Sequence, residues 1–166
     1  MSNLINIAGT EPVIDPNYRY QMPPLERKIE GRGNGIKTVL PNLAQVAQAL
    51  HRTPQEITKC FGVSLGAQSR YGKDERAIVN GEFSQQQLHT VLSEYIEEFV
   101  LCPNCRQPEV PRYKVKKGEI RKKCLGCGYR SVVNPHHKLC TFILQMDKQN
   151  RKERKKKTQK HPVHLD

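Results

Sequence analysis

An arginine between two tyrosines is the first group of residues in this chain that could do chemistry. Residues 18–38 read YRYQMPPLERKIEGRGNGIKT, so Arg19 precedes two prolines and a loop with three glycines. Its guanidinium group is a planar, permanently charged fork that matches phosphate oxygens, and the flanking tyrosines could fix its direction. The same pattern fits a solvated arginine, or one paired with Glu26 or Glu30 for less than about 1 kcal/mol.

The loop that ends this stretch combines flexible backbone with hydrogen-bond donors. Its glycines allow sharp turns and close approach to a partner, and its donor side chains belong to Arg32, Asn34 and Lys37. The loop reads G-R-G-N-G rather than G-x-G-x-x-G, and no glycine directly precedes the lysine, so the Walker pattern is absent. We expect no nucleotide site within the chain, and we expect residues 18–38 to face a negatively charged partner together.

Two C-x-x-C pairs give the most specific signal in the sequence. Cys102 and Cys105 are followed, after eighteen residues, by Cys124 and Cys127. Four thiolates on two tight turns are a ligand set for structural Zn²⁺ and leave no open position for water. A redox dithiol would instead need one reactive pair, usually at the start of a helix in a βαβ unit.

The residues between and after the two pairs predict a zinc ribbon. Residues 112–115 and 119–123 flank a Lys-Gly turn, which predicts a hairpin too small to fold without its metal. His136, His137 and Cys140 are not expected to be ligands, because the four-thiolate set is complete. We expect them to pack with the apolar residues that follow.

Composition limits the size of the core and favours an anionic partner. The chain has 166 residues, 36% of them apolar, with no tryptophan and a net charge of +12. Residues 148–166 hold eight of the 28 Lys and Arg residues, so the rest of the chain is basic too. This favours nucleic acid as a partner. With no membrane span or secretory signal visible, and cysteines spaced for metal, we expect a cytoplasmic monomer.

The sequence predicts an α+β fold in four parts. Residues 1–17 should form a flexible arm and residues 18–98 a small mixed α/β domain. Residues 99–145 should form the ribbon with a closing segment, and residues 146–166 a basic, disordered tail.

Local signals place the elements of the α/β domain. Strands are expected at 36–40, 65–71 and 76–79, the last two joined across a turn. Helices are expected after Asn42, after a capping box of Thr53 and Glu56 with an end at Gly62, and after a capping box of Ser84 and Gln87. The last helix carries a regular apolar stripe through Val100, and Cys60 is expected in the core. Gln68, Ser69 and Arg70 either meet a partner or form an ordinary polar strand face.

Taken together, several short stretches of this sequence resemble the family of N-terminal domains of eukaryotic translation initiation factor 5. The matching stretches are Y-R-Y-Q-M-P-P at 18–24, E-G-R-G-N-G-I-K-T at 30–38, K-C-F-G at 59–62, L-G-A-Q at 65–68, I-V-N-G at 78–81, F-V-L-C at 99–102 and H-K-L-C-T-F-I-L at 137–144. The resemblance covers about residues 16–145. The β subunit of initiation factor 2 shares the arrangement of an α/β part followed by a ribbon. It is not expected to carry the glycine-loop stretch at 30–38 or the arginine between tyrosines.

The resemblance implies a translation initiation factor that is no enzyme by itself. It implies a GTPase activator for the γ subunit of initiation factor 2, in the complex with the β subunit, initiator tRNA, the mRNA start codon and the small ribosomal subunit. Arg19 would act like an arginine finger, assisted by Lys37 and Lys59. The residues expected near RNA are Arg32, Asn34, Gly35, Lys37 and Arg70.

Other hypotheses remain open at this point. The chain could be a zinc-ribbon module that only binds RNA or the ribosome, a structural subunit like the β subunit of initiation factor 2, or a competitor without activator function. Family members usually continue into a helical-repeat domain that recruits other factors. We do not expect that recruitment from the present chain.

Overall fold

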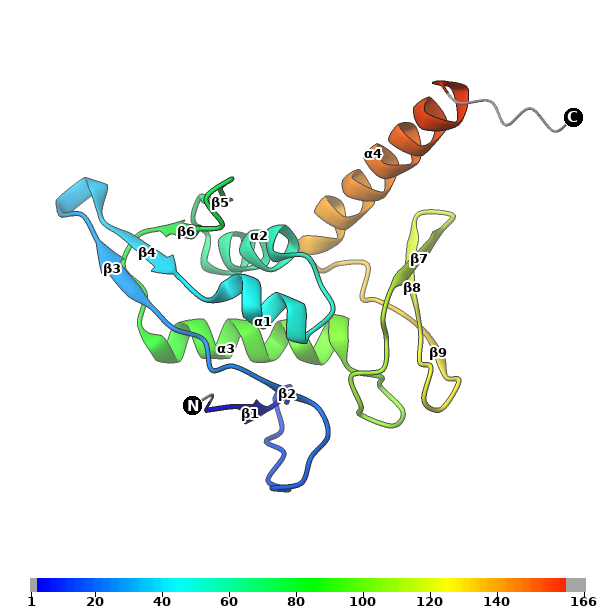
Figure 1. The fold of residues 1–166 in the computed structure, drawn as a ribbon, viewed down its shortest axis with the longest axis horizontal. Helices are drawn as coiled ribbons and strands as arrows, with labels where there is room; N and C mark the ends of the chain where they lie inside the picture. The colour runs from blue at the N-terminus through cyan, green and yellow to red at the C-terminus, as the bar shows by residue number, and fades with distance from the viewer. Residues whose placement is uncertain (1–2, 161–166) are drawn as a thin grey trace, which may run out of the picture.

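A computed structural model describes residues 3–160, which form an α/β part, a three-stranded ribbon and a long C-terminal helix (Figure 1). The elements are β1 (Ile5–Asn6), β2 (Gln21–Met22), β3 (Lys28–Glu30), η1 (Gly33–Gly35), β4 (Lys37–Leu40), α1 (Leu43–Ala49), α2 (Pro54–Leu65), β5 (Ser69–Tyr71), β6 (Ala77–Asn80), α3 (Gln85–Tyr95), η2 (Ile96–Val100), β7 (Tyr113–Lys116), β8 (Glu119–Lys123), β9 (Arg130–Val132) and α4 (Leu139–Lys160). This mixed α/β architecture was predicted.

A four-stranded antiparallel sheet forms one side of the α/β part. Its order is β3-β4-β6-β5. The strands predicted at 36–40 and 76–79 are confirmed by β4 and β6, whereas the strand predicted at 65–71 is confirmed only for β5, because Leu65 still belongs to α2. Leu40, Ala77 and Val79 project into the core beneath the helices.

The opposite face of the sheet carries Val39 and Ile78, which pair across β4 and β6 and are only 3% and 5% exposed. None of the described helices lies over this face in Figure 1, and we call it the open face. The groups that it offers to a partner are polar, because Arg70 and Asn80 are exposed there.

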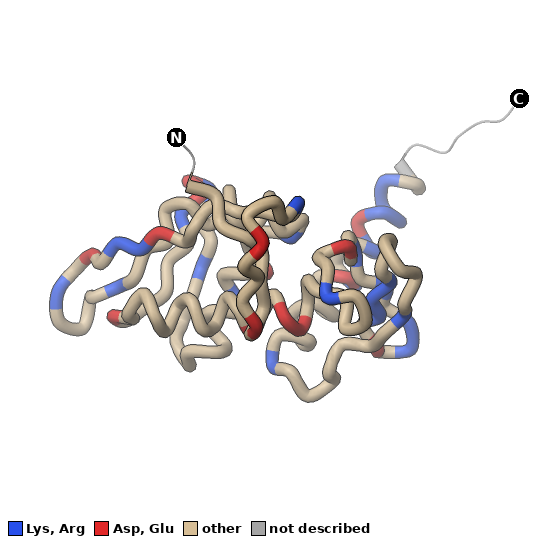
Figure 2. The backbone as a smooth tube through the Cα atoms, turned by 90° about the horizontal axis from the view of Figure 1, so that it is seen from below, with Lys and Arg blue, Asp and Glu red and all other residues tan. Residues whose placement is uncertain are grey.

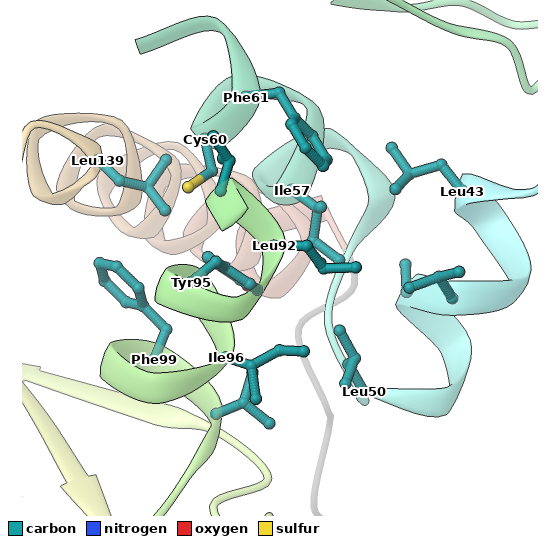
Figure 3. Packing of buried hydrophobic residues seen from close by; sticks show 14 of the residues in the cluster. Leu43, Leu50, Ile57, Cys60, Phe61, Leu92, Tyr95, Ile96, Phe99 and Leu139 are labelled. Carbon is teal, nitrogen blue, oxygen red and sulfur yellow. The ribbon is translucent and has the colours of Figure 1, made fainter. Parts of the chain in front are cut away.

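One hydrophobic core joins the α/β part to the ribbon and to α4. Figure 3 shows Phe61 of α2 and Tyr95 of α3 packing among aliphatic side chains, with Leu139 of α4 beside them. Ile120 and Val133 of the ribbon belong to the same cluster. Each fully buried large apolar side chain contributes about 1.5–3 kcal/mol. The predicted boundary between residues 98 and 99 therefore does not separate two cores.

Helix ends follow the predicted capping chemistry only in part. Ser84 and Gln87 form the expected capping box of α3. The Thr53 hydroxyl accepts a hydrogen bond from the backbone of Glu56, but the Glu56 carboxylate turns inward, so only half of that box exists. The prediction that α2 ends at Gly62 is wrong. The helix ends at Gly66, whose φ of 66° suits glycine.

Gly62 and Asn42 serve packing rather than helix termination. A Cβ at Gly62 would lie 2.2 Å from Ser69 Oγ, so this glycine lets α2 approach β5. Asn42 makes no capping hydrogen bond to α1. Its side chain instead accepts from the Glu26 amide at 2.9 Å and donates to the Pro24 carbonyl at 2.7 Å. It therefore fixes the segment between β2 and β3.

The prediction of a flexible N-terminal arm is wrong for the described residues. β1 pairs with β2 in an antiparallel ladder. Ile7 is only 2% exposed, and the Asn6 side chain donates to the carbonyls of Val13 and Asp15. These contacts, together with the hydrogen bond from the Thr10 amide to Glu97, fold the arm back onto the domain, and residue periodicity does not reveal them.

The prediction of a disordered tail is also wrong up to Lys160. α4 continues from its buried start at Leu139 to that residue without a Gly or Pro. Lys, Arg, Glu and Gln have favourable helix propensity, and Asp147 pairs with Arg151 one turn later at 2.9 Å. The remainder of the predicted tail, residues 161–166, lies outside the described part of the chain.

A half-buried arginine, Arg52, joins the ribbon to the helices. His51 adopts a φ of 56°, and the Arg52 amide donates back to the Ala47 carbonyl at 3.0 Å, as at a left-handed helix end. This turn sends the Arg52 side chain inward. The guanidinium donates to the carbonyls of Phe99 at 2.7 Å and Val110 at 2.6 Å.

The same arginine completes a polar cluster around the ribbon's first strand. It donates to the Tyr113 hydroxyl at 3.0 Å, and its Cζ lies 4.8 Å from the centroid of that ring. The Glu56 carboxylate accepts hydrogen bonds from Tyr95 and Tyr113. Burial raises the pKa of Glu56, while these hydrogen bonds and the nearby arginine act in the opposite direction. The cluster therefore stays paired although it is largely shielded from water.

We expect Arg52→Ala to lower the free energy of unfolding by about 3–5 kcal/mol, because it leaves a buried carboxylate without its cation and carbonyls without donors. Urea denaturation followed by circular dichroism measures this loss. Arg76→Ala is the matched control. Arg76 bonds Glu30 at 2.7 Å with 40% of its side chain exposed, so its loss should cost less than about 1 kcal/mol. Equal losses for the two variants would contradict the role of Arg52.

Candidate functional site

The four predicted cysteines converge on one point at the end of the ribbon. Their sulfur atoms all lie within 4.8 Å of one another, with Cys102 and Cys127 3.6 Å apart and Cys105 and Cys124 also 3.6 Å apart. Four sulfurs bound tetrahedrally at about 2.3 Å from zinc would be separated by about 3.8 Å. The donor set therefore fits a metal ion held by four thiolates.

The thiols of this centre differ in pKa. Hydrogen bonding, chiefly from the Tyr129 amide, lowers the pKa of the Cys127 thiol to about 6. The Cys127 amide in turn donates to the Cys124 sulfur at 3.4 Å. The hydrogen bonds to its sulfur favour the thiolate form of Cys127, whereas burial raises the pKa of Cys105 to about 12, so that this thiol has to lose its proton when a metal binds.

The other candidate ligands lie apart from the four cysteines. Among the described residues, the cluster that could hold a metal consists of the four cysteines. His137 packs edge-on against Phe99 at 4.8 Å, and Cys140 is buried with its sulfur 3.2 Å from the Asn134 carbonyl. Cys60 is also buried, and burial raises its pKa to about 12. His137, Cys140 and Cys60 contribute to packing, as expected, whereas His136 is exposed, so the expectation that it packs with the apolar residues is wrong.

Arg19 lies at the rim of a cleft between the α/β part and the first cysteine knuckle. The cleft has a volume of about 710 Å³, and its lining includes His51, Glu109 and Arg112. The Arg19 side chain is exposed, with its Cζ 5.7 Å from the centroid of the Tyr20 ring. Within residues 3–160 it forms no ion pair, so the alternative pairing with Glu26 or Glu30 is not found.

Contacts with the ribbon hold the tyrosines on either side of this arginine. The Tyr20 hydroxyl donates to the Glu109 carboxylate, and the Tyr18 and Tyr20 rings meet edge to face at 5.5 Å. Partial burial raises the pKa of Tyr18, with the nearby Cys105 sulfur adding to the effect. The direction in which Arg19 points therefore depends on where the first knuckle lies.

The glycine loop lies at the far end of the α/β part from the ribbon (Figure 1). Gly31 has a φ of 84°, and a Cβ there would lie 2.3 Å from the Gly35 carbonyl oxygen. Only glycine permits this tight closure. Arg32 and Asn34 are exposed on the loop, as is Gly35.

Lys37 and Arg70 meet on the open face of the sheet. They border one shallow surface of about 270 Å³ with Asn80. Ser69 offers no free hydroxyl there, because its Oγ is buried against Gly62 and has no hydrogen-bond partner in the structure. The segment 68–70 therefore offers only its first and last side chains to a partner.

The predicted site residues thus form more than one surface. The expectation that residues 18–38 face a partner as one group is wrong, because β3 and β4 carry the glycine loop away from the ribbon (Figure 1), whereas Glu109 of the ribbon holds the segment of Arg19. Lys37 lies with Arg70, and Lys59 is exposed on α2. A single partner could reach all of them only by extending along the domain.

Sequence reasoning missed two residues that position the site. Arg52 directly precedes the capping residue Thr53. Glu109 lies in a loop between Pro108 and Pro111. Neither belongs to a recognised motif. Both act through contacts with residues more than 40 positions away in the chain, and such contacts leave no local pattern.

The comparisons with known proteins agree with the resemblance seen in the sequence. Residues 10–130 match the family described as a domain found in initiation factors 2B and 5. Eukaryotic translation initiation factor 5 of Mus musculus is 49% identical over 140 residues, which are 83% of this chain and 33% of the relative. The Caenorhabditis elegans factor is 48% identical over 134 residues (80% and 30%), and the Saccharomyces cerevisiae factor 44% over 132 residues (79% and 33%). The chain spans about a third of the length of these curated relatives. Among its described helices, none is long and apolar enough to cross a membrane.

We expect the purified chain to hold one zinc ion, and Cys124→Ser to hold less than about a tenth of an equivalent, because three thiolates lose most of the affinity of four. Plasma mass spectrometry of protein dialysed against a weak chelator measures this. Cys60→Ala is the control and should retain its zinc, since Cys60 lies in the apolar core. Stoichiometric zinc in the Cys124 variant would contradict the assignment.

Proposed function

This chain belongs to the family of domains found in initiation factors 2B and 5, and on that premise we propose that it activates GTP hydrolysis by initiation factor 2. The nucleotide belongs to the γ subunit of that factor, in the complex with initiator tRNA on the small ribosomal subunit. This chain supplies an arginine in trans and has no catalysis of its own. The relatives in the comparison are initiation factors by name, and the remainder of the proposal rests on the site.

The observation that carries the proposal is the state of Arg19. Its guanidinium is exposed at the rim of a cleft, and no acidic side chain within residues 3–160 pairs with it. The ring of Tyr20 lies behind it, and Glu109 holds that ring from the ribbon. An unpaired arginine on a supported segment is a charge kept available for another molecule.

Phosphoryl transfer explains what such an arginine can do. As GTP is hydrolysed, negative charge spreads over the γ-phosphate oxygens, and catalysis consists mainly of positioning and of stabilising that charge. An arginine supplied in trans accelerates hydrolysis by about 10³–10⁵, or roughly 4–7 kcal/mol. The planar fork can bind two oxygens at once, which a lysine cannot do.

The glycine loop and the open face of the sheet have a separate task in this proposal. Arg32, Asn34 and Gly35 are exposed where the loop can approach initiator tRNA and the start codon. Lys37 and Arg70 continue this surface along the sheet. The glycine loop between β3 and β4 lies far from the ribbon in Figure 1, whereas Glu109 of the ribbon holds the segment of Arg19, which supports a division between RNA contact and activation.

Lys37 and Lys59 then assist activation indirectly. Both are accessible but lie away from the cleft that holds Arg19, on β4 and α2. We assign them to docking on the initiation complex. Zinc, when bound by the four cysteines, fixes the first knuckle. The loop that follows this knuckle holds the arginine segment through the hydrogen bond between Tyr20 and Glu109.

We expect Arg19→Ala to lower the stimulated rate of GTP hydrolysis by about 10³ or more while its affinity for the initiation complex changes by less than about threefold. Single-turnover hydrolysis in a complex assembled from initiation factor 2, GTP, initiator tRNA and small subunits gives the rate. Arg112→Ala is the matched control, because Arg112 is exposed in the same cleft. It should keep most of the activity. Normal hydrolysis with Arg19→Ala would exclude the finger role.

A further inference from the structure

Helix α4 starts in the core and then leaves it. Leu139, Cys140 and Ile143 are buried, whereas the side chains of residues 148–159 are all exposed. Figure 1 shows the second half of α4 projecting from the body of the molecule. These residues contribute nothing to the core, and apart from Arg151, which pairs with Asp147, their basic groups form no ion pair within residues 3–160.

Basic side chains occur around the whole of α4, but on one side of the helix they form a stripe without an acidic residue, whereas on the other side Arg154 and Lys157 are interspersed with Asp147 and Glu153. The basic residues of the stripe recur with the spacing i, i+3, i+4, i+7 and i+8, and the stripe consists of Lys148, Arg151, Lys152, Lys155 and Lys156. Residues at this spacing share one side of a helix. At about 100° per residue, the acidic residues Asp147 and Glu153 both fall outside the stripe.

The stripe faces away from the part of α4 that packs on the domain. By the same helical spacing, Leu139 and Ile143 lie on the opposite side. Arg151 sits at the margin of the stripe, where it pairs with Asp147 and donates to the Val115 carbonyl of β7 at 3.0 Å. This contact with the edge strand of the ribbon fixes how α4 is rotated. Figure 2 shows the Lys and Arg residues gathered along this helix.

The side-chain types of the stripe indicate which class of molecule can bind it. Lysines provide point charges that suit phosphate groups and do not read base edges. Proteins that bind single strands use aromatic side chains as stacking platforms, and α4 has none after Phe142. A straight row of charges about 12 Å long instead matches the regular phosphate rows of a duplex.

We propose that the basic stripe of α4 binds the phosphate backbone of double-stranded RNA. The choice of RNA rests on membership of a translation factor family. The proposal is otherwise independent of Arg19 and of GTP hydrolysis, because the stripe lies on an element that does not line the cleft.

A comparison of two double variants of the full chain tests this. Lys152→Gln/Lys155→Gln removes two stripe charges, and Arg154→Gln/Lys157→Gln removes two charges from the other side of the same helix. Both keep good helix formers, which circular dichroism can verify. Fluorescence anisotropy with a 20-base-pair RNA duplex, titrated at about 50–200 mM KCl, gives the affinity and its dependence on salt.

We expect the stripe variant to bind at least about tenfold more weakly than the unmodified chain, with the salt slope reduced by about 1.8, since each phosphate contact contributes about 0.9. The control should lose less than about threefold. Equal losses in the two variants would overturn the proposal. So would tighter binding to a DNA duplex of the same sequence, or to poly-glutamate, which would indicate DNA or an acidic protein as the partner.

Discussion

The carbonyl groups at the end of α3 and η2 determine how this molecule holds together. The last carbonyls of a helix have no partner within it and carry partial negative charge. Here the Lys122 ammonium group of β8 binds the carbonyl of Glu98, and Arg52 binds that of Phe99. Burial lowers the pKa of Lys122 because it disfavours the charged ammonium group. The hydrogen bond to the Glu98 carbonyl offsets this cost. Two cations from different segments thus anchor the ribbon to the central helix.

Further contacts extend this anchorage to the N-terminal arm and to Arg19. Glu97 pairs with Arg106 of the first knuckle and accepts from the Thr10 amide of the arm. From the loop after the knuckle, Glu109 holds Tyr20. The N-terminal arm is thus tied to η2, and the segment that carries the arginine is tied through Tyr20 to the loop after the first knuckle, whose turns suit a metal ion. A structural metal could in this way influence a catalytic event in another protein without taking part in its chemistry.

The sequence predicted those features that depend on residues close together in the chain. The cysteine knuckles, the Ser84 capping box and the stripe of α3 were identified because each has a local spacing with one physical explanation. Arg52 and Glu109 could not be identified, because their partners lie far away in the sequence. The tail was misjudged for another reason: its composition excludes a buried core, but a helix needs no core when its residues favour helical backbone.

The division of residues 18–38 into two surfaces also could not be predicted. Two prolines and a glycine loop indicate bends but not their direction, and only the pairing of β3 with β4 shows that the loop is carried away from the ribbon. Arg19 is therefore best understood together with residues distant in sequence. The hydrogen bond from the Tyr20 hydroxyl to the Glu109 carboxylate contributes more to the proposed function of Arg19 than the glycine loop that follows in the sequence.

The most direct measurement of the central claim is a double-mutant cycle on stimulated GTP hydrolysis, with Tyr20→Phe and Arg19→Ala alone and combined. If the hydrogen bond from Tyr20 to Glu109 acts by aiming the arginine, Tyr20→Phe will slow hydrolysis in the unmodified chain and will have no further effect once Arg19 is alanine. The same loss in both backgrounds would show that the tyrosine and the arginine act separately, and would contradict the positioning role of that hydrogen bond.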